Sequence, residues 1–207
     1  MADIVNGYLT EGEAISYVGQ NLTAPDANRD FLTDTVTAAS RLIDRFCGRR
    51  FYTEGSIGTP EARKFVPPSS GDTLHLGPYN DLQSASSVTF DGVAQASGDY
   101  ELGPIATGTD EPWQWLRIIG GATWPTVTSS TRSDLITISG VWGWAEVPAE
   151  VKAACRLIVA EMVKLRDAPL GIAGGLDSGT VFTRRSLPPR AMDLLAPYRH
   201  GLNFGIA

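Results

Sequence analysis

Residues 38–51 read AASRLIDRFCGRRF, and residues 138–162 read ISGVWGWAEVPAEVKAACRLIVAEM. In and around each stretch, apolar side chains recur at alternating steps of four and three positions, which is the spacing of one helical face. The first face consists of Leu32, Val36, Ala39, Ile43 and Phe46. The second consists of Val151, Cys155, Ile158, Met162 and Leu165. The pattern predicts two long amphipathic helices, the first over residues 26–47 and the second after Pro148.

Shorter helices are predicted near both ends of the chain. Thr10 and Glu13 have the spacing of a capping box, in which each side chain accepts a hydrogen bond from the other residue's backbone N–H. A short helix should follow and end at Gly19. Pro188 and Pro189 favour a second short helix over residues 190–195.

Residues 51–144 have a different pattern, in which short and partly alternating apolar runs lie between turn residues. Asp91-Gly92 is the strongest turn signal, because both residues tolerate the positive φ of a two-residue hairpin. The region favours a small antiparallel sheet or a barrel-like meander. The predicted strands are residues 63–66, 73–76, 87–90, 99–102, 115–118 and 135–140.

Together these patterns predict an α+β fold. The expected architecture is a small helical bundle, with two long helices plus short terminal helices, and a β-rich antiparallel insertion between the long helices. Residues 1–50 and 145–170 should form the helical body, and residues 51–144 the β-rich insertion. Residues 171–207 should form a flexible tether and a C-terminal docking segment, because residues 171–179 are rich in glycine.

The chain has 207 residues, a formal net charge of −6 and a pI near 4.9. This acidity argues against binding DNA with the whole surface, but it is compatible with a wall that repels phosphate and surrounds DNA. Cys47 and Cys155 fall within the predicted long helices and are expected to be buried thiols. No signal peptide and no apolar run of membrane-spanning length occurs, so we expect synthesis in the cytoplasm and no membrane contact.

The sequence lacks the signatures of catalytic and metal sites. His75 and His200 are the two histidines, and neither lies in the context of a Ser–His–Asp site. No HExxH motif, EF-hand loop or P-loop occurs. We therefore predict no enzymatic activity, no cofactor and no metal, and a small hydrolase with a pocket near His75 is the catalytic alternative.

Five tryptophans lie in or beside the β-rich region, at positions 113, 115, 124, 142 and 144. Sheet packing is the first interpretation, and a protein interface or a sugar-stacking platform are the alternatives. Trp142 and Trp144 are expected to cover the end of the sheet and anchor the second long helix. Arg49 and Arg50 are expected to contact helix-end carbonyls or a neighbouring carboxylate, with phosphate binding as the alternative.

The last part of the chain combines basic and apolar side chains. We predict a docking peptide that folds against a partner, and a solvated terminus is the alternative. The candidate docking residues are Arg184, Arg185, Arg190, Leu194, Leu195, Tyr198 and Arg199.

The order and spacing of these motifs resemble the head–tail connector, or adaptor, proteins of long-tailed double-stranded DNA bacteriophages. The shared features are YLTEGE near the N-terminus, the pattern AASxxIDxxCGRxF, the pattern GWxxVPxxVxxA that leads into a long helix, and the closing PPRAMDLLAPYR. The structural motif residues are Ile43, Cys47, Gly48, Arg49, Phe51, Trp142, Trp144 and Pro148.

This resemblance implies a structural virion protein located at the head–tail interface. Proteins of this family form a ring, usually dodecameric, under the portal protein. They extend the DNA channel and dock the next neck or tail component. The implied partners are other copies of the chain, the portal, that next component, and double-stranded DNA that passes without sequence-specific binding.

Two alternatives remain beside the adaptor. The first is a head-closure or tail-completion neck protein, for which we expect a mainly β-barrel chain without two long helices. The second is a carbohydrate- or host-binding accessory module that uses the Trp-rich insertion.

Overall fold

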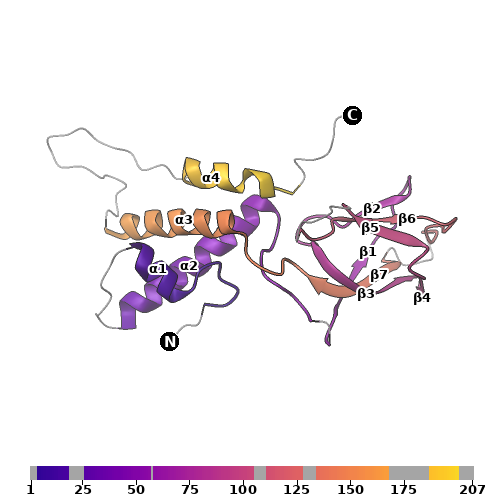
Figure 1. The fold of residues 1–207 in the computed structure, drawn as a ribbon, viewed down its shortest axis with the longest axis horizontal. Coiled ribbons are helices and arrows are strands. Elements are labelled where there is room, and N and C mark those ends of the chain that lie inside the picture. The colour runs from indigo at the N-terminus through magenta and orange to yellow at the C-terminus, as the bar shows by residue number, and fades with distance from the viewer. Residues whose placement is uncertain are drawn as a thin grey trace. The chain divides into compact units, whose positions relative to one another are not determined.

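The computed structural model describes residues 4–18, 26–56, 58–104, 111–127, 134–167 and 187–200. Two compact units are present (Figure 1), and we call them the helical unit, Met1–Gly48 with Val147–Ala207, and the β unit, Arg49–Glu146. The described helices are α1 (Glu11–Val18), α2 (Asp26–Cys47), α3 (Ala149–Asp167), α4 (Pro189–Leu195) and the 3₁₀ helix η1 (Ala196–Tyr198). The described strands are β1 (Glu61–Phe65), β2 (Thr73–His75), β3 (Leu82–Phe90), β4 (Val93–Ala94), β5 (Tyr100–Gly103), β6 (Trp115–Ile118) and β7 (Ile136–Trp142).

The predicted architecture of a helical bundle with a β-rich insertion is wrong. Among the described residues, four α helices accompany seven strands that form two antiparallel sheets. The strands also enclose a hydrophobic core of their own, which a mere insertion into a bundle would lack. The fold is therefore mixed α+β with substantial β content. The error arose because two long helical repeats dominate the sequence pattern, whereas each short strand acquires its burial only from distant partners.

The helical unit is built on the apolar faces of α2 and α3. Fully buried side chains on these faces include Val36, Ala39, Ile43, Val151, Cys155 and Ile158. Gly48 ends α2 with a φ of 66°, and its N–H donates to the Asp44 carbonyl at 2.8 Å. Pro148 directly precedes α3, and its carbonyl accepts from the Lys152 N–H at 3.0 Å. Both predicted long helices are thus confirmed, as are Gly48 at the end of the first and Pro148 before the start of the second.

The capping box at the start of α1 is also confirmed. The Glu13 N–H donates to Thr10 Oγ1 at 3.2 Å, and the Thr10 N–H donates to Glu13 Oε2 at 2.8 Å. These two bonds satisfy backbone donors that the first helical turn leaves free. The short helix therefore begins where the sequence predicts it.

The β unit consists of a four-stranded sheet, in the order β1-β7-β3-β4, and a three-stranded sheet, in the order β2-β6-β5. Side chains of both sheets form one apolar core, which includes Leu74 and Leu116 from one sheet and Val88 and Ile138 from the other. The hairpin between β3 and β4 is confirmed, because Asp91 and Gly92 both have positive φ.

Candidate functional site

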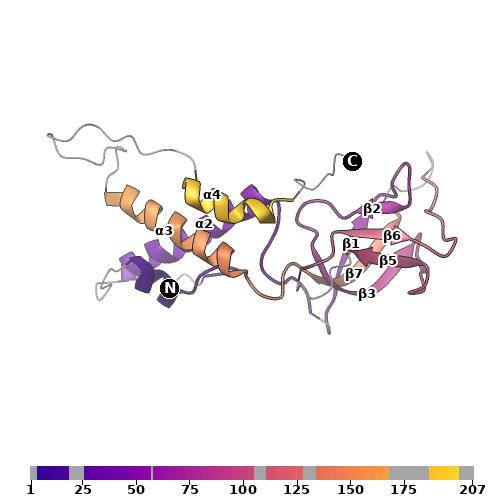
Figure 2. The same cartoon turned by 45° about the horizontal axis from the view of Figure 1, so that its top comes forward.

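The described part of the C-terminal segment, residues 187–200, packs on the helical unit of its own chain. Figures 1 and 2 both show α4 alongside α3. Ala191 and Leu195 on α4 have no exposed surface, whereas Arg190 is exposed and Leu194 is half-buried. α4 therefore turns an apolar face toward the helical unit and leaves Arg190 on its outer side.

Three further contacts fix the end of this segment. The Tyr198 hydroxyl donates to Glu150 Oε2 at 3.0 Å, and the His200 N–H donates to the Cys47 carbonyl at 2.6 Å. The Arg199 guanidinium lies 5.0 Å from the centre of the Phe46 ring. The Cys47 carbonyl in the last turn of α2 has no partner within the helix, and the His200 N–H supplies one. Arg199 places a positive charge near the same end, where the helix dipole is negative. We call Phe46, Cys47 and Glu150 the seat of the C-terminal segment.

The seven predicted docking residues thus fall into different environments. Leu195, Tyr198 and Arg199 contact the helical unit of their own chain, and Arg190 is exposed. Arg184 and Arg185 lie outside the described residues, as does the predicted tether over residues 171–179.

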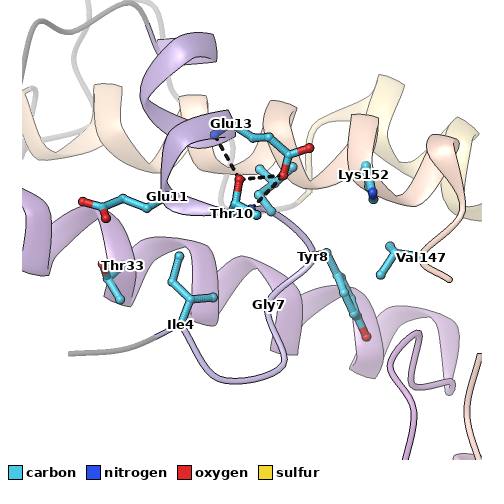
Figure 3. A pocket seen from close by; sticks show the side chains of 10 residues that line it. Ile4, Gly7, Tyr8, Thr10, Glu11, Glu13, Thr33, Val147 and Lys152 are labelled. Atoms are coloured by element: carbon cyan, nitrogen blue, oxygen red, sulfur yellow. Dashed lines mark hydrogen bonds between the residues drawn. The ribbon is translucent and has the colours of Figure 1, made fainter. Parts of the chain in front are cut away.

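The helical unit also contains a hollow of about 420 Å³, shown in Figure 3. Its acidic groups are engaged: Glu11 pairs with Arg29, and Glu13 accepts from Thr10. The hydrogen bond from Arg29 lowers the pKa of Glu11, and the backbone hydrogen bond from Thr10 lowers the pKa of Glu13. Carboxylates held ionised in helix caps and ion pairs are unsuited to accept and release protons in catalysis. The lining residues are Ile4, Gly7, Tyr8, Leu9, Thr10, Glu11, Glu13, Thr33, Val147 and Lys152.

A buried polar cluster joins the two ends of the β unit. Arg49 Nη1 lies 2.6 Å from Asp81 Oδ1, and both side chains are less than a tenth exposed. Trp144 Nε1 donates to the other carboxylate oxygen at 3.3 Å, and the Gly143 N–H donates to the Asp81 carbonyl at 2.8 Å. We call Arg49, Asp81 and Trp144 the Asp81 clasp. It holds Arg49 at the start of the β unit and Trp144 near its end against the residue that precedes β3.

The electrostatics of the clasp are dominated by its burial. Burial raises the pKa of Asp81 to about 6, while Arg49 and the hydrogen bond from Trp144 act in the opposite direction. Arg49 and Arg50 were expected to contact helix-end carbonyls or a neighbouring carboxylate, and the structure shows the carboxylate: Arg49 pairs with Asp81, and Arg50 Nη1 lies 2.7 Å from Glu54 Oε1.

The five tryptophans pack in the β unit, and none of them is exposed. Trp142 is fully buried, and its indole N–H donates to the Glu61 carbonyl at 2.8 Å. Trp144 is 7% exposed and stacks on Phe51, with ring centres 5.3 Å apart. The sheet-packing interpretation is therefore confirmed for Trp142 and Trp144, while Trp113, Trp115 and Trp124 are half-buried.

The described residues contain little that suits other chemistry. His75 is exposed between two buried leucines, as its alternation predicts. Cys47 and Cys155 are buried free thiols, and burial raises the pKa of Cys155 to about 12. Within the described ranges, no group of three or more His, Cys, Asp or Glu side chains is placed to hold a metal ion. In the part of the chain that the structure describes, no helix is both long and apolar enough to cross a membrane.

Comparison with known proteins gives structural matches alone. No protein-family model matches the chain, and no curated protein sequence matches it. The fold is similar to a chain in the neck of an empty gene transfer agent (GTA) particle, computed with C6 symmetry, with a TM-score of 0.61 and 16% identity. That similarity covers 96% of this chain and 93% of the other.

A second match lies in the neck of a native GTA particle computed with C12 symmetry. Its TM-score is 0.53 at 15% identity, and it covers 96% of this chain and 92% of the other. At these identities the comparisons establish a shared fold, and the coverage extends over both units. The chain thus has the fold of neck proteins from phage-like particles.

Two of the residues that organise these sites were missed in the sequence. Asp81 pairs with a residue 32 positions away, and Glu150 with one 48 positions away. Neither carboxylate belongs to a motif that reveals its partner. The one local signal is that Asp81 directly precedes a strand.

Proposed function

We propose that this chain is a structural component of the neck of a phage-like particle, in which copies of the chain form a ring. The fold similarity to GTA neck chains over 96% of the chain carries this proposal. The C6 and C12 symmetries of those two structures support a closed ring. A ring needs two different contact patches on each copy, because its interfaces are heterologous.

Within the neck, we propose the adaptor position under the portal, where the ring extends the DNA channel and docks the next component. The 22-residue α2 and the 19-residue α3 favour an adaptor over a head-closure factor, for which a mainly β-barrel chain is expected. The net charge of −6 supports passage of DNA through the ring without phosphate binding. The described residues also support a role without catalysis, because their polar clusters are engaged in caps and ion pairs.

Portal docking is proposed for the arginines of the C-terminal segment. Arg190 is exposed on α4, and Arg184 and Arg185 precede it in the sequence. Leu194, Leu195, Tyr198 and Arg199 belong to the same docking segment, and the burial of Leu195 suggests that these four hold the arginines in position.

Electron microscopy of the chain, alone and mixed with the portal protein of the same particle, tests this proposal. We expect rings seated on the portal, with six- or twelvefold symmetry like that used for the two GTA necks. The Arg190→Glu variant should weaken portal binding, whereas Lys164→Glu, which alters an exposed cation on α3, should not. Rings that form but do not bind the portal would contradict the adaptor position and leave the neck function standing. A chain that stays monomeric and is absent from purified particles would contradict the neck function itself.

A further inference from the structure

The C-terminal segment has a complete set of contacts on the helical unit. Ala191 and Leu195 are fully buried, Tyr198 bonds Glu150, and the His200 N–H bonds the Cys47 carbonyl. The burial of these two side chains and the two hydrogen bonds stabilise the packed state. A seven-residue helix such as α4 is not stable in isolation, so it depends on this packing. The seat should therefore be filled in every state of the protein.

The connection to this segment is much longer than the contacts require. The bond between Tyr198 and Glu150 places the end of the segment beside the start of α3, so α4 runs antiparallel to α3. From helical rises, Pro189 then lies roughly 10 Å short of the end of α3 along its axis. Antiparallel helices of this kind are normally joined by 2–8 residues. Here residues 168–188 intervene, and their fully extended length is on the order of 70 Å.

We propose that in the assembled ring residues 187–200 of one copy occupy the seat of a neighbouring copy. This inference rests on the proposed ring, and it assigns the partner of the seat: a second copy of this chain. The exchange keeps each contact of the segment, because the seat is the same in every copy. Its cost in chain entropy is small, because that cost grows slowly with the length of the connection.

The exchange also explains why so long a connection is useful in a ring. Each copy gives its segment to one neighbour and receives a segment from the other, so the contact is heterologous. A ring of such contacts closes with every seat filled. Neighbours joined in this way share a buried core and not merely a surface. Arg190 stays on the outer side of the seated helix, so the proposed portal contact is compatible with the exchange.

Cross-linking of mixed single-cysteine variants tests the exchange. Glu150 and Tyr198 touch each other through side chains that are exposed and half-exposed, so Glu150→Cys and Tyr198→Cys should leave the fold intact. The two variants are purified separately, mixed in equal amounts, assembled on the portal and treated with a short bismaleimide. A copy of either kind has one half of the pair and cannot form the link alone. We expect covalent dimers that contain the 150–198 linkage, identified by mass spectrometry of peptides.

The double variant, Glu150→Cys with Tyr198→Cys, provides the matched control. In the free subunit it should give the same linkage within one chain, and in the ring it should give a ladder of covalent oligomers. The native Cys47 and Cys155 are buried, and the unsubstituted protein should give no linkage. Rings in which the double variant links only within single chains, and the mixed variants do not link, would overturn the exchange and leave the neck function standing. Failure to form any ring would overturn both.

Discussion

Asp81 illustrates how one buried carboxylate organises the ends of the β unit. Its side chain contacts Arg49, at the start of that unit, and Trp144, near its end, and its carbonyl accepts from the Gly143 N–H. Removing a carboxylate from water is costly, and a single ion pair with a single additional hydrogen bond compensates for it only in part. The raised pKa of Asp81 follows from this imbalance.

The Asp81 clasp should therefore make stability depend on pH. Because the pKa of Asp81 is about 6 in the folded protein and 3.8 for an ordinary aspartate, the folded chain retains a proton that the unfolded chain releases. The stability from this group is complete below about pH 4 and is lost as the pH rises through about 6. The rise in pKa corresponds to about 3 kcal/mol.

We expect Asp81→Asn to remove this part of the pH profile. Between about pH 3 and pH 7 the stability of the variant should rise relative to the native chain by about 3 kcal/mol. Denaturant titrations at each pH, followed by Trp fluorescence, measure the difference. Asp91→Asn, at an exposed turn carboxylate, serves as the control and should parallel the native chain. Parallel profiles for Asp81→Asn as well would show that Asp81 is ionised in the folded protein at pH 4.

Gly143 is a second residue whose identity is fixed by its surroundings. It has a φ of 85°, and an added Cβ would lie 1.9 Å from the Tyr52 carbonyl oxygen. A backbone atom cannot swing aside, so Gly143→Ala should destabilise the β unit by about 3 kcal/mol or more. Gly121→Ala is the matched control, because Gly121 has a φ of 86° but nothing within 4 Å of its added Cβ. Gly121→Ala should lower the free energy of unfolding by about 1–2 kcal/mol, the cost of the backbone strain alone. Equal losses in the two variants, measured by denaturant unfolding, would mean that the carbonyl contact is relieved by movement.

At the scale of elements, the capping box determines where α1 begins. Thr10→Ala removes the side-chain acceptor for the Glu13 N–H, so we expect a loss of about 1 kcal/mol. Hydrogen exchange of the α1 amides should accelerate by about fivefold, which is the ratio equivalent to that energy. Ser16→Ala, at an exposed position within the same helix, should leave the exchange unchanged or slow it slightly. A similar acceleration in both variants would assign the effect to helix propensity and not to the cap.

Helices were predicted more closely than strands, for a physical reason. α2 occupies residues 26–47 as expected, because its apolar face repeats many times and Gly48 provides a local stop. β3 was expected over residues 87–90 but begins at Leu82. The residues in between are mostly serine and alanine, which have no strand signal of their own. They become a strand because β7, more than forty residues later, pairs with them through a register with two irregularities.

The candidate sites show the same division between local and distant causes. The position of Arg49 after the end of α2 indicated helix-end carbonyls or a neighbouring carboxylate as its partners, but the actual partner, Asp81, depends on how the β unit closes. The C-terminal residues were predicted as one docking group because they are adjacent in sequence. Their seat combines Phe46 and Cys47 from α2 with Glu150 from α3. No spacing in the sequence shows that these two helices pack together.

At the scale of the whole molecule, the two units have separate spectroscopic signals. All five tryptophans lie in the β unit, and all four described α helices lie in the helical unit. Trp fluorescence therefore reports unfolding of the β unit, and far-ultraviolet circular dichroism reports mainly the helical unit. Because each unit has its own buried core, a core substitution in one should act mainly on the signal of that unit.

Leu195→Ala tests this separation. Leu195 is fully buried in the helical unit, so its truncation should cost that unit about 2–5 kcal/mol and lower the dichroism midpoint, with the fluorescence midpoint unchanged. Val88→Ala, in the core of the β unit, is the reciprocal variant and should lower the fluorescence midpoint alone. Both midpoints are measured on the full chain in one denaturant series. If either substitution moves the two midpoints together, the units unfold as one cooperative body, and the division into two independent cores does not hold in solution.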